Sequence, residues 1–366
     1  MTAIHQFVPA LLPRDATGDH TFALRDTLRA AGWVSDIYVE SAHDDLWPEA
    51  VYFERYPERA RPDDVLLYQL STASPVADFL IERDQTLVLD YHNITPSSFY
   101  EGWEDHTADK VALARIQAAA LAPRAALGVA DSAFNAADLR RLGCPVTAVV
   151  PILVKIDDRP PVVDELELSR LRSTHRQATV LLFVGRLSPN KAQHHLVEAL
   201  WLYRRFYDPD ARLHLVGPSM TESYADAVFS LADELGLRGA VRHAEGLSDG
   251  QLAAWYADAD VFVCLSEHEG FCIPLLEAMR SGLPIVAYGA GAVPETLGDA
   301  GIVIESSRPS VVAATVDRVR RDAGLADHLI AAGHDRLYDF RPAATRARFV
   351  DVLRPLVDAG AGEARA

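Results

Sequence analysis

The sequence has few cysteines, fewer basic than acidic residues, and no long apolar segment free of interruption. Three cysteines in 366 residues are too few and too scattered for a disulfide framework or a zinc site, and they indicate reduced thiols. The most apolar long stretch, residues 112–130, is interrupted by Arg115, Pro123 and Arg124 and cannot span a bilayer. The first 20 residues lack the basic and apolar segments of a signal peptide. We therefore expect a cytoplasmic protein.

The charge balance argues against one class of partner. The chain has 52 acidic and 35 basic residues, which gives a formal net charge of −17. Such a field repels phosphate backbones and anionic lipid surfaces, so we expect no nucleic-acid partner. The length suggests two domains, because single hydrophobic cores stop growing at roughly 250–300 residues.

Short β-rich apolar runs alternate with helical patterns along almost the whole chain. Most runs are continuous rather than alternating, which is typical of strands buried on both faces of a parallel sheet. The candidate strands are residues 3–8, 35–40, 64–70, 86–92, 127–132, 146–151, 179–185, 212–217, 240–244, 260–266, 284–289 and 301–305. This alternation predicts an α/β protein with doubly wound parallel sheets.

The alternation breaks at residues 152–178, which contain Pro160–Pro161 and a dense run of charge. We predict four parts: a Rossmann-like domain over 1–155, a linker region over 156–177, a second Rossmann-like domain over 178–340, and a C-terminal helix over 341–366 that crosses back toward the first domain. Ligands of such sheets bind beyond the carboxyl ends of the strands, so two facing sheets would form a central cleft.

The motif "GRLSPNK" (185–191) follows a strand and precedes a helix. Gly185 allows a sharp exit from the strand, and Ser188 or Asn190 could cap the helix. Arg186 and Lys191 can then point at one anion near the helix start. A solvated basic pair is the alternative, but a guanidinium and an ammonium after a buried strand suit a diphosphate.

The motif "EHEGFCIPLLE" (267–277) has the same strand–loop–helix layout. Pro274 suits the first turn of a helix, whose free N–H groups offer an anion site. Glu269 in the loop and Glu277 in the helix can accept hydrogen bonds from hydroxyl pairs of sugar and ribose. Two glutamates at this spacing also occur by chance, but together with the basic pair they predict a site for a nucleotide diphosphate sugar.

Three motifs in this order carry a family resemblance. Glu269 and Glu277 with Gly270, Phe271, Pro274 and Ala278, together with "GRLSPNK" and "GAVPETLGDAG" (291–301), resemble retaining GT-B glycosyltransferases of family 4, the glycosyl transferases group 1. The resemblance is strongest over residues 180–305. It implies the GT-B fold, with the acceptor side in the first domain and the nucleotide-sugar donor in the second.

The resemblance also implies individual roles. Arg186 and Lys191 would bind the donor diphosphate, Glu277 the ribose hydroxyls, and Glu269 the donor sugar. Further donor contacts would come from the backbone of Gly270, Phe271, Cys272 and Ile273 and from the Gly246–Leu247 turn against the nucleobase.

Two candidate positions lie in the first domain. His92 ends the strand 86–92 and is similar to a family histidine near the donor sugar, although a lone histidine is often a hydrogen-bonded structural residue. We predict the catalytic set Glu269, His92, Arg186 and Lys191. Gly18, Asp19 and His20 occupy the place of the family's glycine-rich acceptor-side loop, but a loop with a helix cap explains them equally well.

We predict no metal and no cofactor beyond the substrate. No Asp-x-Asp motif stands where a metal would bridge a diphosphate, and the adjacent His194 and His195 cannot face one ion from a helix. The expected reaction is transfer of a mannose- or glucose-type hexose from a GDP- or UDP-linked donor to a hydroxyl acceptor, with retention. A soluble small molecule or saccharide is favoured over a lipid as acceptor. The alternatives are a nucleotide-sugar epimerase, a sugar phosphorylase, or a non-catalytic nucleotide-binding protein.

Overall fold

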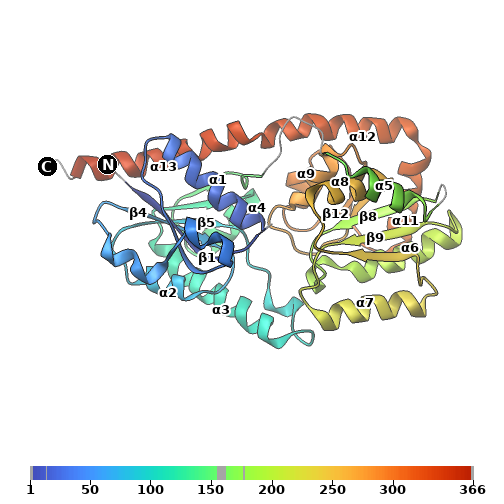
Figure 1. Cartoon of the computed structure of the whole chain (residues 1–366), viewed down its shortest axis with the longest axis horizontal. Helices are drawn as coiled ribbons and strands as arrows, with labels where there is room; N and C mark the ends of the chain where they lie inside the picture. Colours follow the sequence, from blue (N-terminus) through green and yellow to red (C-terminus); the bar gives the residue numbers. More distant parts are fainter. Residues whose placement is uncertain (1–2, 14, 155–161, 176–177, 364–366) are drawn as a thin grey trace. The chain divides into compact units, whose positions relative to one another are not determined.

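The computed structural model describes residues 3–13, 15–154, 162–175 and 178–363, with side chains up to residue 358. The chain divides into two compact units. Unit 1 comprises Met1–Ser98, His106–Lys155 and Phe340–Ala366, and unit 2 comprises Phe99–Asp105 and Ile156–Asp339. Each unit is built on its own parallel sheet (Figure 1).

The sheet of unit 1 has the strand order β3-β2-β1-β4-β5-β6-β7. Its strands are β1 Ile4–Leu11, β2 Ile37–Ala42, β3 Val51–Tyr52, β4 Val65–Leu70, β5 Thr86–Tyr91, β6 Leu127–Ala130 and β7 Thr147–Val149. Its helices are α1 Ala16–Ala30, α2 Pro75–Ile81, α3 Asp105–Leu121, α4 Ala133–Arg141 and α13 Pro342–Glu363, with 3-10 turns at Asp44–Glu49, Phe53–Glu58 and Ala122–Arg124. The 3-10 turns Ser97–Phe99 and Leu337–Phe340 span points where the chain passes from one unit to the other. All strand pairs are parallel, as the continuous apolar runs predict.

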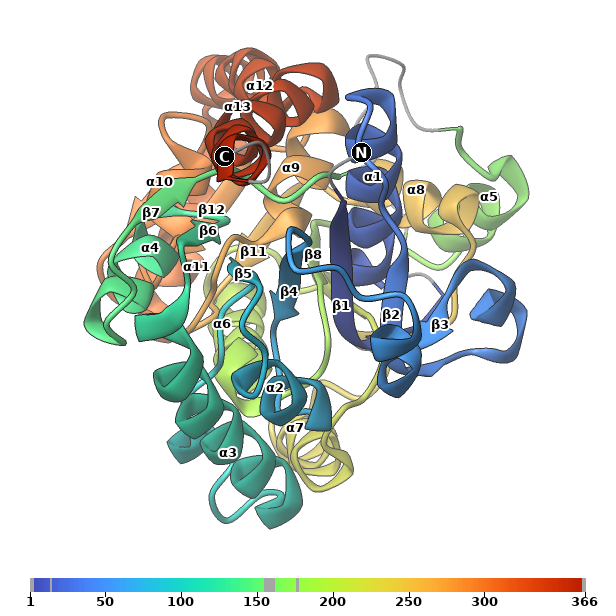
Figure 2. The same cartoon turned by 90° about the vertical axis from the view of Figure 1, so that its left-hand side faces the viewer.

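The core of unit 1 lies on both faces of this sheet. Helices α2, α3 and α4 cover one face through a cluster that includes Phe7 and Tyr68. Helices α1 and α13 cover the other, where Leu24, Phe349 and Leu353 are fully buried (Figure 2). The last helix of the chain therefore completes the core begun by the first.

The sheet of unit 2 has the strand order β10-β9-β8-β11-β12-β13. Its strands are β8 Val180–Val184, β9 Arg212–Val216, β10 Val241–Ala244, β11 Val261–Cys264, β12 Ile285–Tyr288 and β13 Ile302–Ile304. Its helices are α5 Glu165–Arg172, α6 Gln193–Phe206, α7 Glu222–Glu234, α8 Asp249–Asp258, α9 Ile273–Arg280, α10 Val293–Leu297, α11 Pro309–Arg321 and α12 Ala323–Arg336, with a 3-10 turn at Pro189–Lys191. Figure 1 shows α7 on the opposite side of this sheet from α8 and α9.

The chain order reverses between β8 and β11, which are direct neighbours. Their register pairs Leu181 with Val261 and Leu182 with Phe262, so the two strands end at the same edge. In doubly wound sheets this reversal point is where ligands bind. Both sequence motifs of unit 2 follow these two strands.

The structure and the expected boundaries differ at two places, and they agree on the C-terminal helix, which lies with the first domain. Residues 99–105 belong to unit 2, where Ser223 Oγ donates to the Trp103 carbonyl at 2.7 Å. The described part of the expected linker contains α5, which packs on α8 and buries Leu168 and Leu171. Helix α13 belongs to unit 1. Contacts with distant segments decide these assignments, and local composition does not report them.

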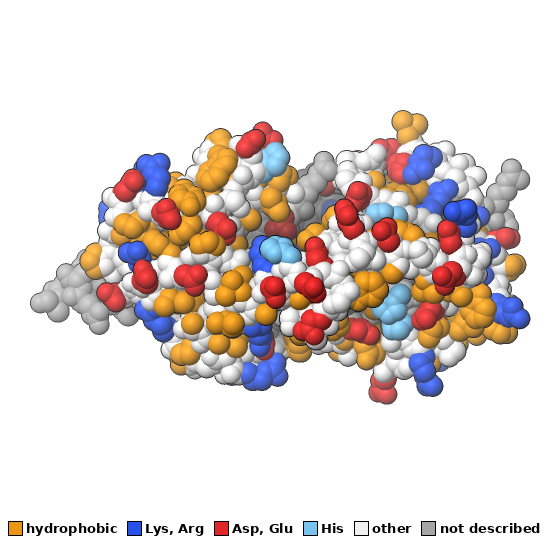
Figure 3. Space-filling model, turned by 90° about the horizontal axis from the view of Figure 1, so that it is seen from below, with side chains coloured by type: hydrophobic (Ala, Val, Ile, Leu, Met, Phe, Trp, Pro, Cys, Tyr) orange, Lys and Arg blue, Asp and Glu red, His pale blue; other side chains and the backbone are white. Residues whose placement is uncertain are grey.

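The surface is mixed in character. On the face drawn in Figure 3, the described acidic side chains are spread among hydrophobic and basic ones, and the basic ones do not gather into one large patch. Among the described helices, none has both the length and the hydrophobicity needed to cross a bilayer.

Candidate functional site

The turn after β8 places two basic side chains at the reversal point. Gly185 donates to the Val216 carbonyl at 2.8 Å, and the exposed Arg186 guanidinium has no hydrogen-bond or ion-pair partner within the described part of the chain. Gln193 Nε2 holds the turn by donating to the Arg186 carbonyl at 2.9 Å. Lys191 ends the 3-10 turn and immediately precedes α6.

The start of α6 differs from the predicted cap. Ser188 Oγ donates to Asn190 Oδ1 at 2.7 Å, so neither side chain caps the helix. The N-cap is Ala192, in the left-handed region with φ of +52°, and it provides no side-chain hydrogen bond. The expectation that Ser188 or Asn190 caps this helix is therefore wrong.

Lys191 and Glu269 form a direct ion pair. Lys191 Nζ lies 2.6 Å from Glu269 Oε1, and their side chains are 16% and 9% exposed. Burial lowers the pKa of Lys191, but the adjacent Glu269 carboxylate outweighs it, so the net pKa is raised and the lysine is charged. The sequence predicts separate roles for these two residues, and the structure brings them into contact.

The third motif supports the loop that carries Glu269. Ala292 donates its N–H to the Glu269 carbonyl at 2.9 Å, and a Cβ at Gly291 would lie 2.3 Å from that oxygen. Only glycine fits such a close approach. Thr296 Oγ1 donates to the Phe271 carbonyl at 2.6 Å. The sequence "GAVPETLGDAG" thus fixes the position of the loop.

Helix α9 begins directly after this loop. Its N-cap, Cys272, is in the left-handed region with φ of +74° and caps no N–H with its side chain. Pro274 occupies the first turn, as predicted. Gly270, Phe271 and Ile273 flank the cap, so their backbone lies at a helix N-terminus, where the helix dipole favours an anion.

Glu277 has a different partner from Glu269. Tyr256 Oη of α8 donates to Glu277 Oε2 at 2.7 Å, and Tyr256 itself is buried. Burial raises the pKa of Glu277, while the Tyr256 hydrogen bond opposes that shift. The half-buried Leu247 lies just before α8, after Gly246 with φ of +67°. The sequence predictions missed Tyr256, whose only signal is its place near the end of the helix that precedes β11.

In unit 1, a chain of hydrogen bonds between side-chain amides determines the protonation state of His92. The Thr21 carbonyl can only accept, and it accepts from Gln6 Nε2 at 3.0 Å. Gln6 Oε1 therefore faces Gln69 Nε2 at 3.0 Å, which turns Gln69 Oε1 toward His92 Nε2 at 2.5 Å. The other nitrogen, Nδ1, lies 3.0 Å from an Asp131 carboxylate oxygen. Since both neighbours of His92 accept, both ring nitrogens carry protons.

The electrostatics agree with that assignment. Burial lowers the pKa of His92, but Asp131 and Asp90 outweigh it and raise the pKa to about 9. His92 is thus an imidazolium whose two N–H groups are used inside unit 1. A signal for this network exists in the sequence, because Gln6 and Gln69 interrupt otherwise apolar strands.

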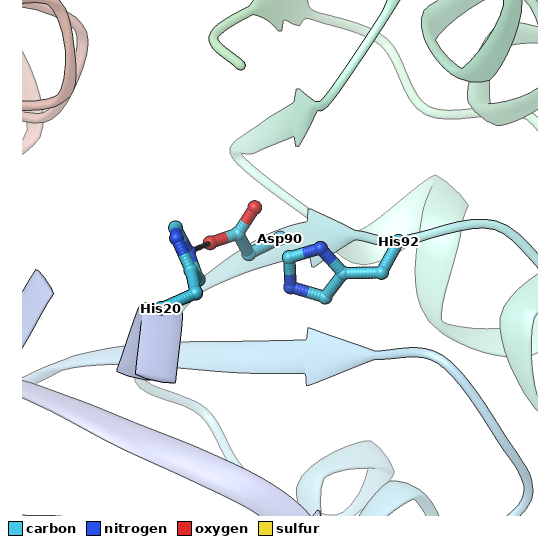
Figure 4. Close-up of side chains that lie close together, drawn as sticks. All are labelled: His20, Asp90 and His92. Carbon is cyan, nitrogen blue, oxygen red and sulfur yellow. Dashed lines mark hydrogen bonds and ion pairs between the residues drawn. The ribbon is translucent and has the colours of Figure 1, made fainter. Parts of the chain in front are cut away.

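The expected acceptor-side residues lie within α1 rather than in a loop. Gly18 donates its N–H to the N-cap carboxylate of Asp15 at 3.0 Å, which is a helix cap. His20 is fully buried; its Nδ1 accepts from the Leu153 N–H at 2.9 Å, and its Nε2 lies 2.8 Å from Asp90 Oδ2 (Figure 4). The half-buried Asp19 lies between them.

Among the residues that the structure describes, two groups of side chains have the composition of metal ligands. They are His20, Asp90 and His92 in unit 1 and Cys264, Glu269 and Cys272 in unit 2. In the first, every ring nitrogen is in a hydrogen bond, and in the second, Glu269 is paired with Lys191. Neither group offers a complete set of free ligand atoms.

Comparison with known proteins shows similarity to one family over part of the chain. Residues 170–336 match the family model of glycosyl transferases group 1. A D-inositol 3-phosphate glycosyltransferase of Thermomonospora curvata is 34% identical over 180 residues, 45% of this chain and 42% of that protein. An MMP alpha-(1->4)-mannosyltransferase of Mycolicibacterium hassiacum is 40% identical over 113 residues, 31% of this chain and 26% of that protein. The chain thus spans less than half the length of these curated relatives.

A likeness to solved structures covers nearly the whole chain. Anabaena HepE, solved in complex with UDP and glucose, superposes with a TM-score of 0.73 at 18% identity, over 97% of this chain and 100% of that chain. The fold is therefore GT-B, as predicted. The match over residues 170–336 agrees with the predicted resemblance to the glycosyl transferases group 1.

Proposed function

We propose that this protein is a retaining glycosyltransferase that moves a hexose from a nucleotide diphosphate sugar to a hydroxyl acceptor without a metal. The observation that carries the proposal is the Lys191–Glu269 ion pair, which lies at the reversal point of the unit 2 sheet. Beside it lies Arg186, whose guanidinium has no partner in the part of the chain that the structure describes. A cation site of this kind suits a diphosphate, and the carboxylates suit the hydroxyls on either side of it.

The charges suggest how the donor enters. In the structure, Glu269 neutralises Lys191. A diphosphate beside Arg186 would compete for the ammonium and release the Glu269 carboxylate to accept from sugar hydroxyls. Glu277, held by Tyr256, would accept from the ribose. The backbone from Gly270 to Ile273 and the Gly246–Leu247 turn would complete the donor contacts.

The same groups would lower the barrier. As the sugar–oxygen bond breaks, positive charge develops on the sugar and negative charge on the leaving diphosphate. Arg186, Lys191 and the N-terminus of α9 stabilise that negative charge from fixed positions, which is typically the largest catalytic term. The departing phosphate would accept the proton of the acceptor hydroxyl on the same face, which gives retention.

His92 belongs in the proposed catalytic set as a fixed positive charge. Because both of its N–H groups are bound inside unit 1, it is not a general base. For Gly18, Asp19 and His20, the helix cap and the buried His20 support the structural interpretation over an acceptor contact.

The relatives support the choice of substrates. Their names include a glycosyltransferase of D-inositol 3-phosphate and a mannosyltransferase, and HepE was solved with UDP and glucose. We infer a GDP- or UDP-linked mannose- or glucose-type donor and a soluble small-molecule or saccharide acceptor, used in the cytoplasm.

Calorimetric titration with GDP, UDP and ADP in buffer containing EDTA tests the donor site. We expect one nucleotide to bind wild type and the control Lys110→Ala, which removes an exposed lysine of α3, while Lys191→Ala loses most of the affinity. Absence of binding by all three nucleotides contradicts the proposal, and binding that requires a divalent metal contradicts its metal-free part. The anomeric configuration of the product, read by NMR, tests retention.

A further inference from the structure

Two of the three cysteines lie in contact within the proposed donor loop. Cys264 ends β11 and Cys272 is the N-cap of α9. Their sulfur atoms are 3.9 Å apart, and a Glu269 carboxylate oxygen lies within 4.8 Å of both. Cys264 is 1% exposed and Cys272 is 8% exposed. The third cysteine, Cys144, belongs to unit 1.

The backbone at Cys272 makes the pair unusual. Its φ of +74° lies in the left-handed region, which glycine adopts freely and side chains rarely adopt. Within the described part of the chain, only Asn93 and Ala192 are other non-glycine residues with positive φ. The backbone at Cys272 thus has a conformation that would be less strained for glycine. The side chain that it carries places a sulfur atom beside the sulfur of Cys264.

We propose that Cys264 and Cys272 are an oxidisable thiol pair, a modification site at which a peroxide converts two thiols into a disulfide. One sulfur attacks a peroxide oxygen, the O–O bond breaks, and a sulfenic acid and one water form. The second sulfur then attacks the sulfenic sulfur; the S–S bond forms, the S–O bond breaks, and a second water leaves. Both thiols together lose two electrons to the peroxide.

A disulfide between Cys264 and Cys272 would move the loop that carries Glu269. A disulfide bond is about 2.05 Å long, so the sulfur atoms must approach by roughly 2 Å. That movement shifts the N-cap of α9 and closes residues 265–271 into a small ring. The consequence for donor binding rests on the proposed function, because Glu269 and the backbone around Cys272 are its donor contacts. Oxidation would then turn the transferase off.

The chain contains its own controls. Cys264→Ala removes one thiol outside the proposed donor contacts, so this variant should fold and keep the donor site. Cys272→Gly removes the other thiol and suits the positive φ, so it should fold, and its own affinity without peroxide is the reference for its oxidation. Cys144→Ala removes a buried thiol of unit 1 that donates only to the Val146 carbonyl, at 3.3 Å.

The experiment treats the full chain with hydrogen peroxide and measures three quantities. Thiols in denaturant should fall from three to one per chain, and dithiothreitol should restore them. The tryptic peptide 243–280, which contains both Cys264 and Cys272, should lose the mass of two hydrogen atoms. Affinity for UDP or GDP should fall at least about tenfold in wild type and Cys144→Ala, and should not change in Cys272→Gly or Cys264→Ala.

The outcomes separate the two proposals. A wild-type protein that keeps three thiols, or loses them without the change in the peptide mass, overturns the thiol pair. A disulfide that leaves nucleotide affinity unchanged overturns its control of the donor site. If the disulfide forms but the reduced protein binds neither nucleotide, the modification site stands and the proposed function falls.

Discussion

The strand-end clusters of the two units differ in how their charges are used. In unit 1, His20 is fully buried and the His92 side chain is 5% exposed, and every ring nitrogen binds an internal partner. In unit 2, the Arg186 side chain is exposed and has no partner among the described residues, while the mostly buried Lys191 and Glu269 neutralise each other. A fully paired network holds a geometry, whereas an unpaired cation can accept a ligand.

The largest effect is expected from Arg186, whose guanidinium has no hydrogen-bond or ion-pair partner among the described residues. Arg186→Ala should lower kcat/KM at least about 100-fold, because removing one preorganised donor from a charge-stabilising site typically costs that much. Arg186→Lys should keep part of the activity, since a point charge replaces the planar fork. Arg348→Ala, an exposed arginine of α13, serves as the control. Near-normal turnover in Arg186→Ala would show that Arg186 does not bind the donor, and the proposed difference between the clusters of unit 1 and unit 2 would be wrong.

Glu277 is held by a tyrosine hydroxyl, whereas Glu269 is held by a lysine, and the variant Tyr256→Phe tests the first of these contacts. Tyr256 donates to the ionised Glu277, so its loss should raise the pKa of Glu277 further above its ordinary value. Donor affinity should fall about tenfold at neutral pH, and its acid limb should move to higher pH. Tyr203→Phe, which removes another buried hydroxyl of unit 2, should change neither. Nucleotide titration between about pH 5 and 8 measures both.

The sealed cluster predicts a pH-dependent stability. The pKa of His92 is raised from 6.5 to about 9, so the stabilisation is fully present below pH 6.5 and is lost as the pH rises through about 9. The difference in unfolding free energy between wild type and His92→Gln should therefore shrink over this range, by about 1–3 kcal/mol. Urea unfolding at several pH values measures it. A constant difference would show that His92 is neutral.

His214 in β9 provides the opposite case. It is fully buried, neither ring nitrogen has a hydrogen-bond partner among the described residues, and burial followed by Arg242 lowers its pKa to about 3. The stability that neutral His214 allows is fully present above pH 6.5 and is lost as the pH falls toward 3. The reason is that His214 takes up a proton in the unfolded state at a higher pH than in the folded state. His214→Leu should be more stable than wild type at pH 4–5, by about 1–2 kcal/mol, with little difference at pH 7. Thermal unfolding at the two pH values tests this.

Much of the fold and half of the site could be predicted from local sequence. Continuous apolar runs identify buried parallel strands, and the residues that follow two of them, Arg186 with Lys191 and Glu269 with Glu277, lie together because β8 and β11 are neighbours. The rest depends on distant contacts. The sequence gives no local sign that Tyr256 reaches Glu277. Gln69 within an apolar strand indicates a buried polar group, but not that this group faces His92. The sequence predicts a loop at Gly18 and His20, because the cap at Asp15 depends on backbone geometry.

The position of α13 has a consequence for how the protein is made. Phe349 and Leu353 close the face of the first sheet that α1 only partly covers, and they come from the far end of the chain. During synthesis, most of unit 2 (residues 156–339) emerges before α13 does. Domains usually fold as units in the order of their synthesis, but here the second unit can close while the first still has an uncovered core. The side of β1 that carries Ile4 is therefore among the last parts of unit 1 to be buried.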